Sequence, residues 1–258
     1  MSLLMDLTGR QLIEVFSAPD PTPGGGSAAA FAGSLGASLL MMVASLPKTR
    51  VGTPESASAL AGAAATLLPL RDRLTALVDE DARAYDAVVG AYRLPKATDG
   101  EKGMRQAAIQ DALRRATDAP LDVMRAADAA AGHAVTVARH GNPSAASDVG
   151  VALELLHAAV AGAALNVGIN VTQVRDVEYV AGATALDRQI EEGMQFVPEA
   201  GRPKNEEGQD SKSHQLRDTC TRGSFFSRTA STVKRAADSC FCTHQILNLA
   251  VDVDVHSS

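Results

Sequence analysis

The chain has 258 residues and a formal net charge of −6, so it is long enough to bury a sizeable core in one or two domains. The acidic balance argues against a general nucleic-acid-binding surface. Hydrophobic residues make up 46% of the chain but aromatic residues only 3%, with no Trp. The apolar residues are largely Ala, Leu and Val, which favours closely packed helices.

All three cysteines lie in the last fifth of the chain, and none forms a CxxC pair or falls near a regular His spacing. Neither a zinc site nor a disulfide framework is therefore expected. The N-terminus lacks a basic stretch followed by an apolar one, so no secretory signal is recognised and a cytoplasmic location is expected.

Apolar spacing predicts helices along most of the chain, and no segment alternates as a strand. The third helix is expected to bend near Pro69, and Asp118-Ala-Pro120 is interpreted as the cap and first turn of a new helix. The fold class is an all-α, up-and-down bundle of about five to six helices with short connections. The expected ranges are about 7–16, 24–46, 55–92, 99–117, 120–139, 143–171 and 176–194.

Two domains of unequal character are expected. Residues 1–195 form the helical domain, whereas residues 196–258 are an atypical tail. The stretch 201–213 is polar and unpatterned, which is typical of disorder.

The helix that begins at residue 24 contains 20 consecutive uncharged residues, from Ser27 to Leu46, which is long enough to span a bilayer. It is rich in Ala, Gly and Ser, which are only weakly lipophilic, and small residues recur every three or four positions at Gly26, Ala29, Gly33 and Gly36. A buried central helix with a smooth packing face explains these residues better, and no membrane partner is expected.

An aspartate interrupts an apolar stripe in the third helix. Positions 74, 77, 81, 85, 88 and 92 are spaced as one helix face, and all are apolar or aromatic except Asp81. A buried carboxylate has a raised pKa unless it is paired, which makes it a candidate general acid or base. A polar core residue bonded to a neighbouring helix explains the same pattern. Asp79 falls on the other side and is expected to form an exposed pair with Arg83.

Gly24, Gly25, Gly26 and Ser27 begin a helix, where free N–H groups and the helix dipole favour an anion. The spacing also fits G-x-G-x-x-A, but no strand precedes it and no acidic residue follows about twenty positions later, so a dinucleotide site is rejected. The glycines serve equally well as a turn and packing device, and both interpretations stay open.

Asp148, Asn166 and Asn170 share one face of a later helix, with Asp148 and Asn166 roughly 27 Å apart. That separation is too long for one small ligand. These residues could line a long groove, belong to different sites across a subunit contact, or make interhelical hydrogen bonds.

Several blocks in order resemble the formimidoyltetrahydrofolate cyclodeaminase / methenyltetrahydrofolate cyclohydrolase family. The resemblance covers residues 1 to about 195, and the tail lies outside it. The blocks are PTPGGGSAAA at residues 21–30, LVDEDARAYDAVV at 77–89, YRLPK at 92–96, SDVGV at 147–151 and ALNVGINV at 164–171.

The resemblance implies a homodimer with a folate cleft near the subunit contact, and one-carbon chemistry on tetrahydrofolate without a metal or redox cofactor. Asp81 matches the aspartate regarded as catalytic in that family. The absence of a recognisable formyltransferase-like domain tilts the expectation from cyclodeaminase slightly towards cyclohydrolase; a non-catalytic helical scaffold or folate-binding module is the alternative. The positions implied to line the substrate site are Gly24, Gly25, Gly26, Ser27, Lys96, Asp148, Asn166 and Asn170.

Overall fold

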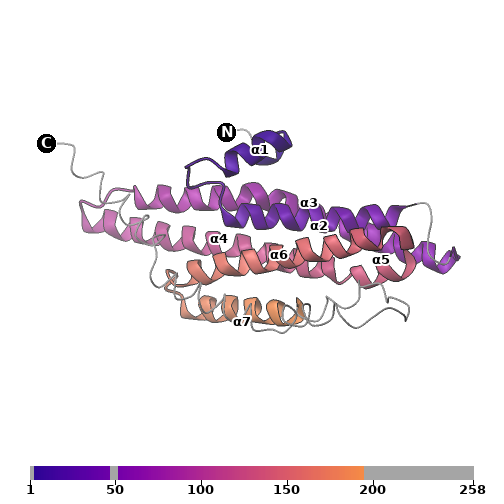
Figure 1. Ribbon diagram of the computed structural model, residues 1–258. Coiled ribbons are helices and arrows are strands. Elements are labelled where there is room, and N and C mark those ends of the chain that lie inside the picture. The colour runs from indigo at the N-terminus through magenta and orange to yellow at the C-terminus, as the bar shows by residue number, and fades with distance from the viewer. Residues whose placement is uncertain (1–2, 47–51, 195–258) are drawn as a thin grey trace, which may run out of the picture. The chain divides into compact units, whose positions relative to one another are not determined.

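The computed structural model describes residues 3–46 and 52–194, and every regular element in this part of the chain is helical. Four long helices form the bundle, each packed along the next in a ring that α6 closes against α2 (Figure 1). This confirms the predicted all-α fold. The four are α2 (Gly25–Ser45), α3 (Pro54–Tyr92), α4 (Asp99–Ala131) and α6 (Ala146–Val171).

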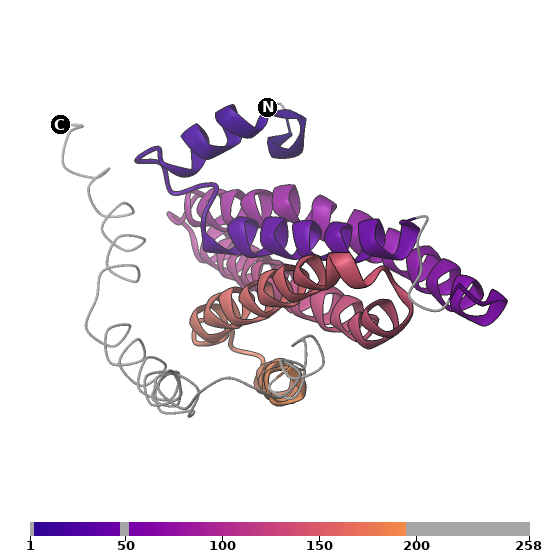
Figure 2. The same ribbon diagram turned by 45° about the vertical axis from the view of Figure 1, so that its right-hand side comes forward.

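Shorter elements surround the four-helix bundle. The C-terminal helix α7 packs against α4 and α6, and the 3₁₀ helix η1 packs against α3. Helix α1 lies beside the bundle rather than within it (Figure 2). The predicted tail, residues 196–258, lies outside the described residues. The shorter elements are η1 (Leu4–Asp6), α1 (Gly9–Phe16), α5 (Ala134–His140), η2 (Pro143–Ala145) and α7 (Val177–Met194).

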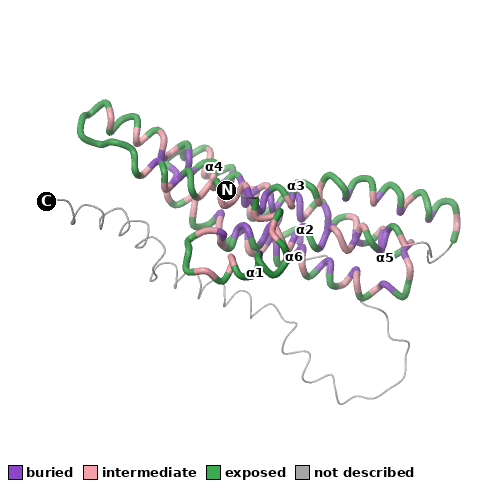
Figure 3. The backbone as a smooth tube through the Cα atoms, turned by 90° about the horizontal axis from the view of Figure 1, so that it is seen from above, coloured by how far each residue is buried: buried purple, intermediate pink, exposed green. Residues whose placement is uncertain are grey.

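Helix α2 is a central, closely packed helix, as its small residues predicted. A methyl group added at Gly36 would lie 2.8 Å from the carbonyl oxygen of Ala152, and one at Gly33 would lie 3.2 Å from the Cβ of Ala159. The backbones of α2 and α6 approach so closely at Gly36 that only glycine fits there, whereas a Cβ atom at Gly33 would meet side chains of α3 and α6. Figure 3 shows that buried residues concentrate where the four long helices lie together.

By length and composition, two helical stretches could cross a membrane. Gly25–Ser45 has a mean hydropathy of 1.7 over its most apolar window, and Pro143–Val171 has 1.5. The first contributes to the core of the bundle, where 56% of that window is buried, whereas only 39% of the second is buried. The core position of α2 accounts for its apolar character.

The prediction that a helix ends before Pro120 is wrong, because α4 runs without interruption from Asp99 to Ala131. Proline lacks an N–H group, so the carbonyl of Ala116, four residues earlier, loses its regular partner. The side chain of Asn170 on α6 supplies the missing donor, with Nδ2 2.7 Å from that carbonyl oxygen. A bond from a neighbouring helix therefore stabilises a proline within α4.

Helix α3 is the long helix that the apolar stripe predicted. Thr53 caps its start by accepting a hydrogen bond from the Ser56 N–H, and Pro54 occupies the first turn, where a missing N–H costs nothing. The helix is continuous through Pro69, which is exposed, and ends at Tyr92. Asp81 consequently lies on a regular helix, well away from either end.

Candidate functional site

The carboxylate of Asp81 lies against the first turn of α2. Ser27 is fully buried and donates a hydrogen bond from Oγ to Oδ2 of Asp81 over 3.0 Å. Gly24 is the N-cap of α2, so the N–H groups of Gly25, Gly26 and Ser27 belong to the helix turn that has no partners within the helix. The glycine-rich helix start is thus an anion seat, and the anion it receives is the chain's own Asp81 carboxylate.

Gly26 makes this contact possible. A Cβ atom at Gly26 would lie 2.6 Å from Cγ and 2.7 Å from Oδ2 of Asp81, closer than atoms can approach without displacement. Gly26 is buried in an ordinary helical conformation. Glycine at this position therefore leaves space for the carboxylate and is not needed for an unusual backbone angle. The packing role is observed, whereas binding of a substrate anion at this turn stays a prediction.

Burial raises the pKa of Asp81 above the ordinary aspartate value, while hydrogen bonds from the side chain and backbone of Ser27 oppose that shift. Among the described residues, no lysine, arginine or histidine forms an ion pair with this carboxylate. Desolvation of an unpaired carboxyl group is therefore the larger effect. An aspartate of this kind exchanges a proton closer to neutral pH than an exposed one does.

Asn166 completes the set of predicted residues that the structure brings together. A Cβ atom at Gly25 would lie 3.6 Å from Nδ2 of Asn166, so this amide lies beside the first turn of α2. The same Nδ2 donates to the carbonyl oxygen of Gly162, one turn earlier in α6, over 2.8 Å. The amide is therefore oriented by its own helix.

Three other predicted site residues lie elsewhere or are already engaged. Lys96 is exposed beyond the end of α3, and the helix between Asp81 and Tyr92 alone spans about 16 Å. Asp148 lies in the first turn of α6, roughly 27 Å along that helix from Asn166. Asn170 uses its amide to bond α4, so interhelical hydrogen bonding accounts for it.

The prediction that Asp79 is exposed and paired with Arg83 is wrong. Asp79 is only 7% exposed, and its carboxylate accepts hydrogen bonds from the backbone N–H groups of Leu4, over 2.5 Å, and Met5, over 3.5 Å. No ion pair with Arg83 occurs within the described ranges. The spacing within α3 could not reveal this contact, because its partners lie 75 and 74 residues earlier.

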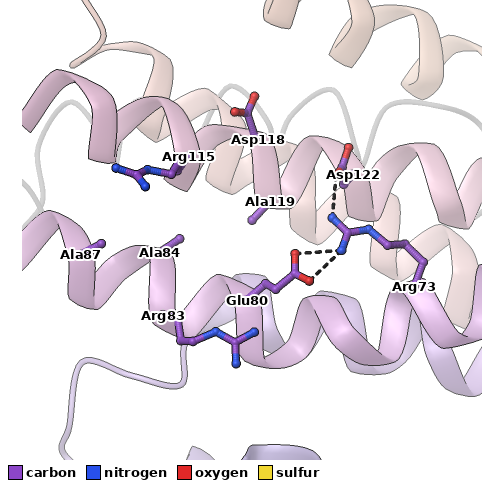
Figure 4. A pocket seen from close by; sticks show the side chains of 9 residues that line it. All are labelled: Arg73, Glu80, Arg83, Ala84, Ala87, Arg115, Asp118, Ala119 and Asp122. Carbon is purple, nitrogen blue, oxygen red and sulfur yellow. Dashed lines mark hydrogen bonds and ion pairs between the residues drawn. The ribbon is translucent and has the colours of Figure 1, made fainter. Parts of the chain in front are cut away.

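A surface pocket of about 370 Å³ lies between α3 and α4, on a side of α3 turned away from α2 (Figure 4). Arg73 lies at one end of it and bridges Glu80 and Asp122, each over 2.7 Å. Three arginines and three acidic residues line the pocket, so the opposite charges balance, and Asp81 does not reach it. This pocket is separate from the Asp81 site.

Comparisons with known proteins identify the family of this chain. The sequence model of a family described as formiminotransferase-cyclodeaminase matches residues 8–188. A methenyltetrahydrofolate cyclohydrolase of Methylorubrum extorquens is 41% identical over 174 residues, covering 66% of this chain and 84% of the relative. A formimidoyltransferase-cyclodeaminase of Rattus norvegicus is 35% identical, covering 67% of this chain but only 32% of the relative.

A solved structure resembles the fold as well. The crystal structure of a formiminotetrahydrofolate cyclodeaminase from Thermotoga maritima superimposes with a TM-score of 0.67 and 25% identity, covering 76% of this chain and 93% of that one. The helical architecture, the matched residues and the level of identity agree: the chain belongs to the formiminotransferase-cyclodeaminase family.

Proposed function

We propose that this chain is a folate one-carbon enzyme that hydrolyses 5,10-methenyltetrahydrofolate to 10-formyltetrahydrofolate, with Asp81 as the acid/base. The observation that carries the proposal is the Asp81 carboxyl group, unpaired by any described cation, held by Ser27 at a helix start and given a raised pKa by burial. Relatives named as cyclohydrolase and cyclodeaminase support the substrate class.

The proposed reaction begins when water attacks the methenyl carbon that joins N5 and N10 of the folate. The Asp81 carboxylate accepts one proton from that water as the new C–O bond forms. The bond from the carbon to N5 then breaks, Asp81 returns its proton to N5, and the hydroxyl proton leaves to solvent as the formyl C=O forms. A carboxyl group with a raised pKa suits both proton transfers.

Cyclodeamination of 5-formiminotetrahydrofolate is the second candidate reaction. There N10 attacks the formimino carbon and ammonia departs, which requires a proton to leave N10 and another to reach the departing nitrogen. The same carboxyl group could serve both steps. We favour the cyclohydrolase because the relative that carries that name is 41% identical, whereas the relatives from Rattus norvegicus and Gallus gallus named as formimidoyltransferase-cyclodeaminases are 35% and 34% identical. The chain spans about a third of the length of those two relatives.

The test is a turnover assay of the purified full chain with each folate in separate reactions. Loss of the near-ultraviolet absorbance of 5,10-methenyltetrahydrofolate is expected, at a rate proportional to enzyme concentration. Faster conversion of the formimino substrate, with ammonia release, would replace the cyclohydrolase by the cyclodeaminase. Absence of turnover with both substrates, despite folate binding, would leave the non-catalytic folate-binding module as the function.

We also propose that the chain forms a homodimer through α2 and α6. Large apolar side chains on these two neighbouring helices are exposed, among them Leu35 (43%), Val151 (52%), Leu165 (53%) and Ile169 (44%). Exposed apolar side chains mark an interaction site where they form one contiguous surface, and this proposal takes these four to do so. Sedimentation of the wild type as a dimer, and of a Leu35→Glu, Leu165→Glu variant as a monomer, is the expected result; a monomeric wild type would refute the dimer.

Further properties remain predictions: a cytoplasmic location, no nucleic-acid or membrane partner, and catalysis without a metal or redox cofactor. Absence of a metal requirement is checked by assaying the chain after prolonged dialysis against a chelator. Unchanged turnover is expected, and a loss restored by a divalent cation would contradict the prediction.

A further inference from the structure

Asp79, two residues before Asp81, is a buried carboxylate that binds the N-terminal segment. It is 7% exposed and receives the backbone N–H groups of Leu4 and Met5 from η1. The side chains of Leu4 and Met5 pack against the main core cluster. The Asp79 carboxylate therefore attaches the N-terminal segment to α3, at the helix turn that also carries Asp81.

The segment that starts at this attachment leads directly to the Asp81 site. From η1 the chain passes through α1 and a turn to Gly24, the N-cap of α2. Its far end is held by the hydrogen bond of Ser27 to Asp81. Asp79 and Asp81 are about 3 Å apart along the axis of α3, so both ends of the segment are fastened to one turn of that helix.

Between η1 and Gly24, only Leu12 and Pro23 of the segment are buried. Helix α1 has a single buried residue, Leu12, whereas Ile13 is 72% exposed. Figures 1 and 2 place α1 beside the bundle. A segment with few buried apolar contacts has low local stability, so the hydrogen bonds at its two ends contribute much of what holds it in place. The contact at Asp79 consequently restrains the approach of the chain to the first turn of α2.

We propose that Asp79 is a positioning residue for the reaction: by holding Leu4 and Met5 against α3, it keeps the first turn of α2 seated on Asp81. This inference rests on the proposed function, because the group that it positions is the proposed acid/base. Asp79 contacts no reacting group in this account and acts through the N-terminal segment and through the shared turn of α3. Its effect is therefore expected on kcat, with little change in KM.

Two variants weaken the contact from opposite sides. Asp79→Asn removes the charge and one of the two acceptor oxygens, and Leu4→Pro removes the Leu4 N–H donor while leaving Asp79 intact. Proline fits at Leu4 because this is the first residue of η1, preceded by an extended residue, where a helix accepts proline. Leu4→Ala keeps the N–H and is the matched control for the lost side chain, and Asp86→Asn is the control for an exposed aspartate of α3.

Both disrupting variants are expected to lower kcat about tenfold or more with KM within about twofold, since small displacements of a catalytic group are costly. The controls are expected to stay within about threefold of the wild type. Hydrogen exchange at the Leu4 and Met5 amides, measured without substrate, is expected to accelerate in Asp79→Asn. Because the turn both shields Asp81 from water and supplies the Ser27 hydrogen bonds, the pKa of Asp81, measured by carboxyl NMR, is expected to differ from that in the wild type.

Unchanged kcat in Leu4→Pro together with faster exchange of the Met5 amide would overturn the proposal, because the contact would then be structural only. Should Asp79→Asn fail to fold, Leu4→Pro against Leu4→Ala still decides the question. If the wild type turned over neither folate, the proposed function would fail by itself. The Asp81 titration would then still decide whether Asp79 controls the environment of that carboxyl group.

Discussion

Replacing Gly26 by alanine tests the seating of Asp81 with a single methyl group. The new Cβ would lie 2.6 Å from Cγ and 2.7 Å from Oδ2 of Asp81, whereas non-bonded carbon atoms prefer about 3.5–4.0 Å. The carboxylate must therefore move by roughly 1 Å. Because Asp81 is a short side chain on a regular helix, it can rotate away, and that movement separates it from Ser27.

Activity and stability should respond very differently to this methyl group. A displacement of about 1 Å at a reacting group costs about 100-fold in rate. Alanine gains about 0.5–1 kcal/mol over glycine in a helix, and overpacking costs about 1–3 kcal/mol. The net loss of unfolding free energy is therefore about 1 kcal/mol, which leaves the protein folded at 25 °C.

The assay compares the turnover of 5,10-methenyltetrahydrofolate with urea unfolding of the same preparations. Gly62→Ala is the matched control, because Gly62 is an exposed glycine of α3, and a Cβ atom added there would have no neighbouring atom within 4 Å. It is expected to gain about 0.5–1 kcal/mol of stability with unchanged turnover. Turnover of Gly26→Ala within about threefold of the wild type would show that the contact between Gly26 and Asp81 has no catalytic importance.

Three further predictions follow from the hydrogen bonds and burial. Ser27→Ala removes a bond that stabilises the ionised form of Asp81, so its pKa should rise and the acidic limb of the pH–rate profile should move to higher pH; an unmoved limb would contradict this. Asn170→Ala should lower the free energy of unfolding by about 1–3 kcal/mol. The loss should be clearly smaller in a Pro120→Ala background, where the backbone N–H of residue 120 can bond the Ala116 carbonyl. Equal losses in both backgrounds would refute the pairing of Asn170 with that carbonyl. Burial, together with a neighbouring glutamate, raises the pKa of Asp187 from 3.8 to about 6, so its ionised form destabilises the native state above pH 6 and this penalty fades as pH falls towards 4. With allowance for the partial exposure of Asp187, Asp187→Asn should add on the order of 1 kcal/mol to the free energy of unfolding at pH 7.5 and nothing near pH 4. A gain in stability that persists at pH 4 would exclude titration of Asp187 as the cause.

The patterns within single helices were reliable guides to the fold. Apolar spacing located α3 and placed Asp81 on its packed face, because helix periodicity is a local property. Small residues every three or four positions identified α2 as a closely packed helix for the same reason. The anion seat at Gly24–Ser27 was also recognisable, but its occupant was not, because Asp81 lies 54 residues from Ser27 in the sequence.

Contacts between distant segments were the source of the errors. Pro120 predicted a helix boundary by a local rule, and a side chain on α6 overrides that rule. Asp79 lies opposite the apolar stripe of α3, a position that predicts an exposed side chain. Nothing in α3 itself indicates that η1 covers that side. The resemblance implies substrate-lining roles for Lys96 and Asp148, but the fold of one subunit does not bring either residue to Asp81.

The most direct test of the central claim is the turnover of Asp81→Asn measured beside its stability. Acid/base catalysis contributes about 10²–10⁴-fold, so turnover of 5,10-methenyltetrahydrofolate should fall by at least about 100-fold while folate binding is retained. Because burial raises the pKa of Asp81, its ionised form destabilises the folded state at pH 7, and the variant should unfold no more easily than the wild type there. Turnover within tenfold of the wild type would contradict the assignment of Asp81 as the acid/base.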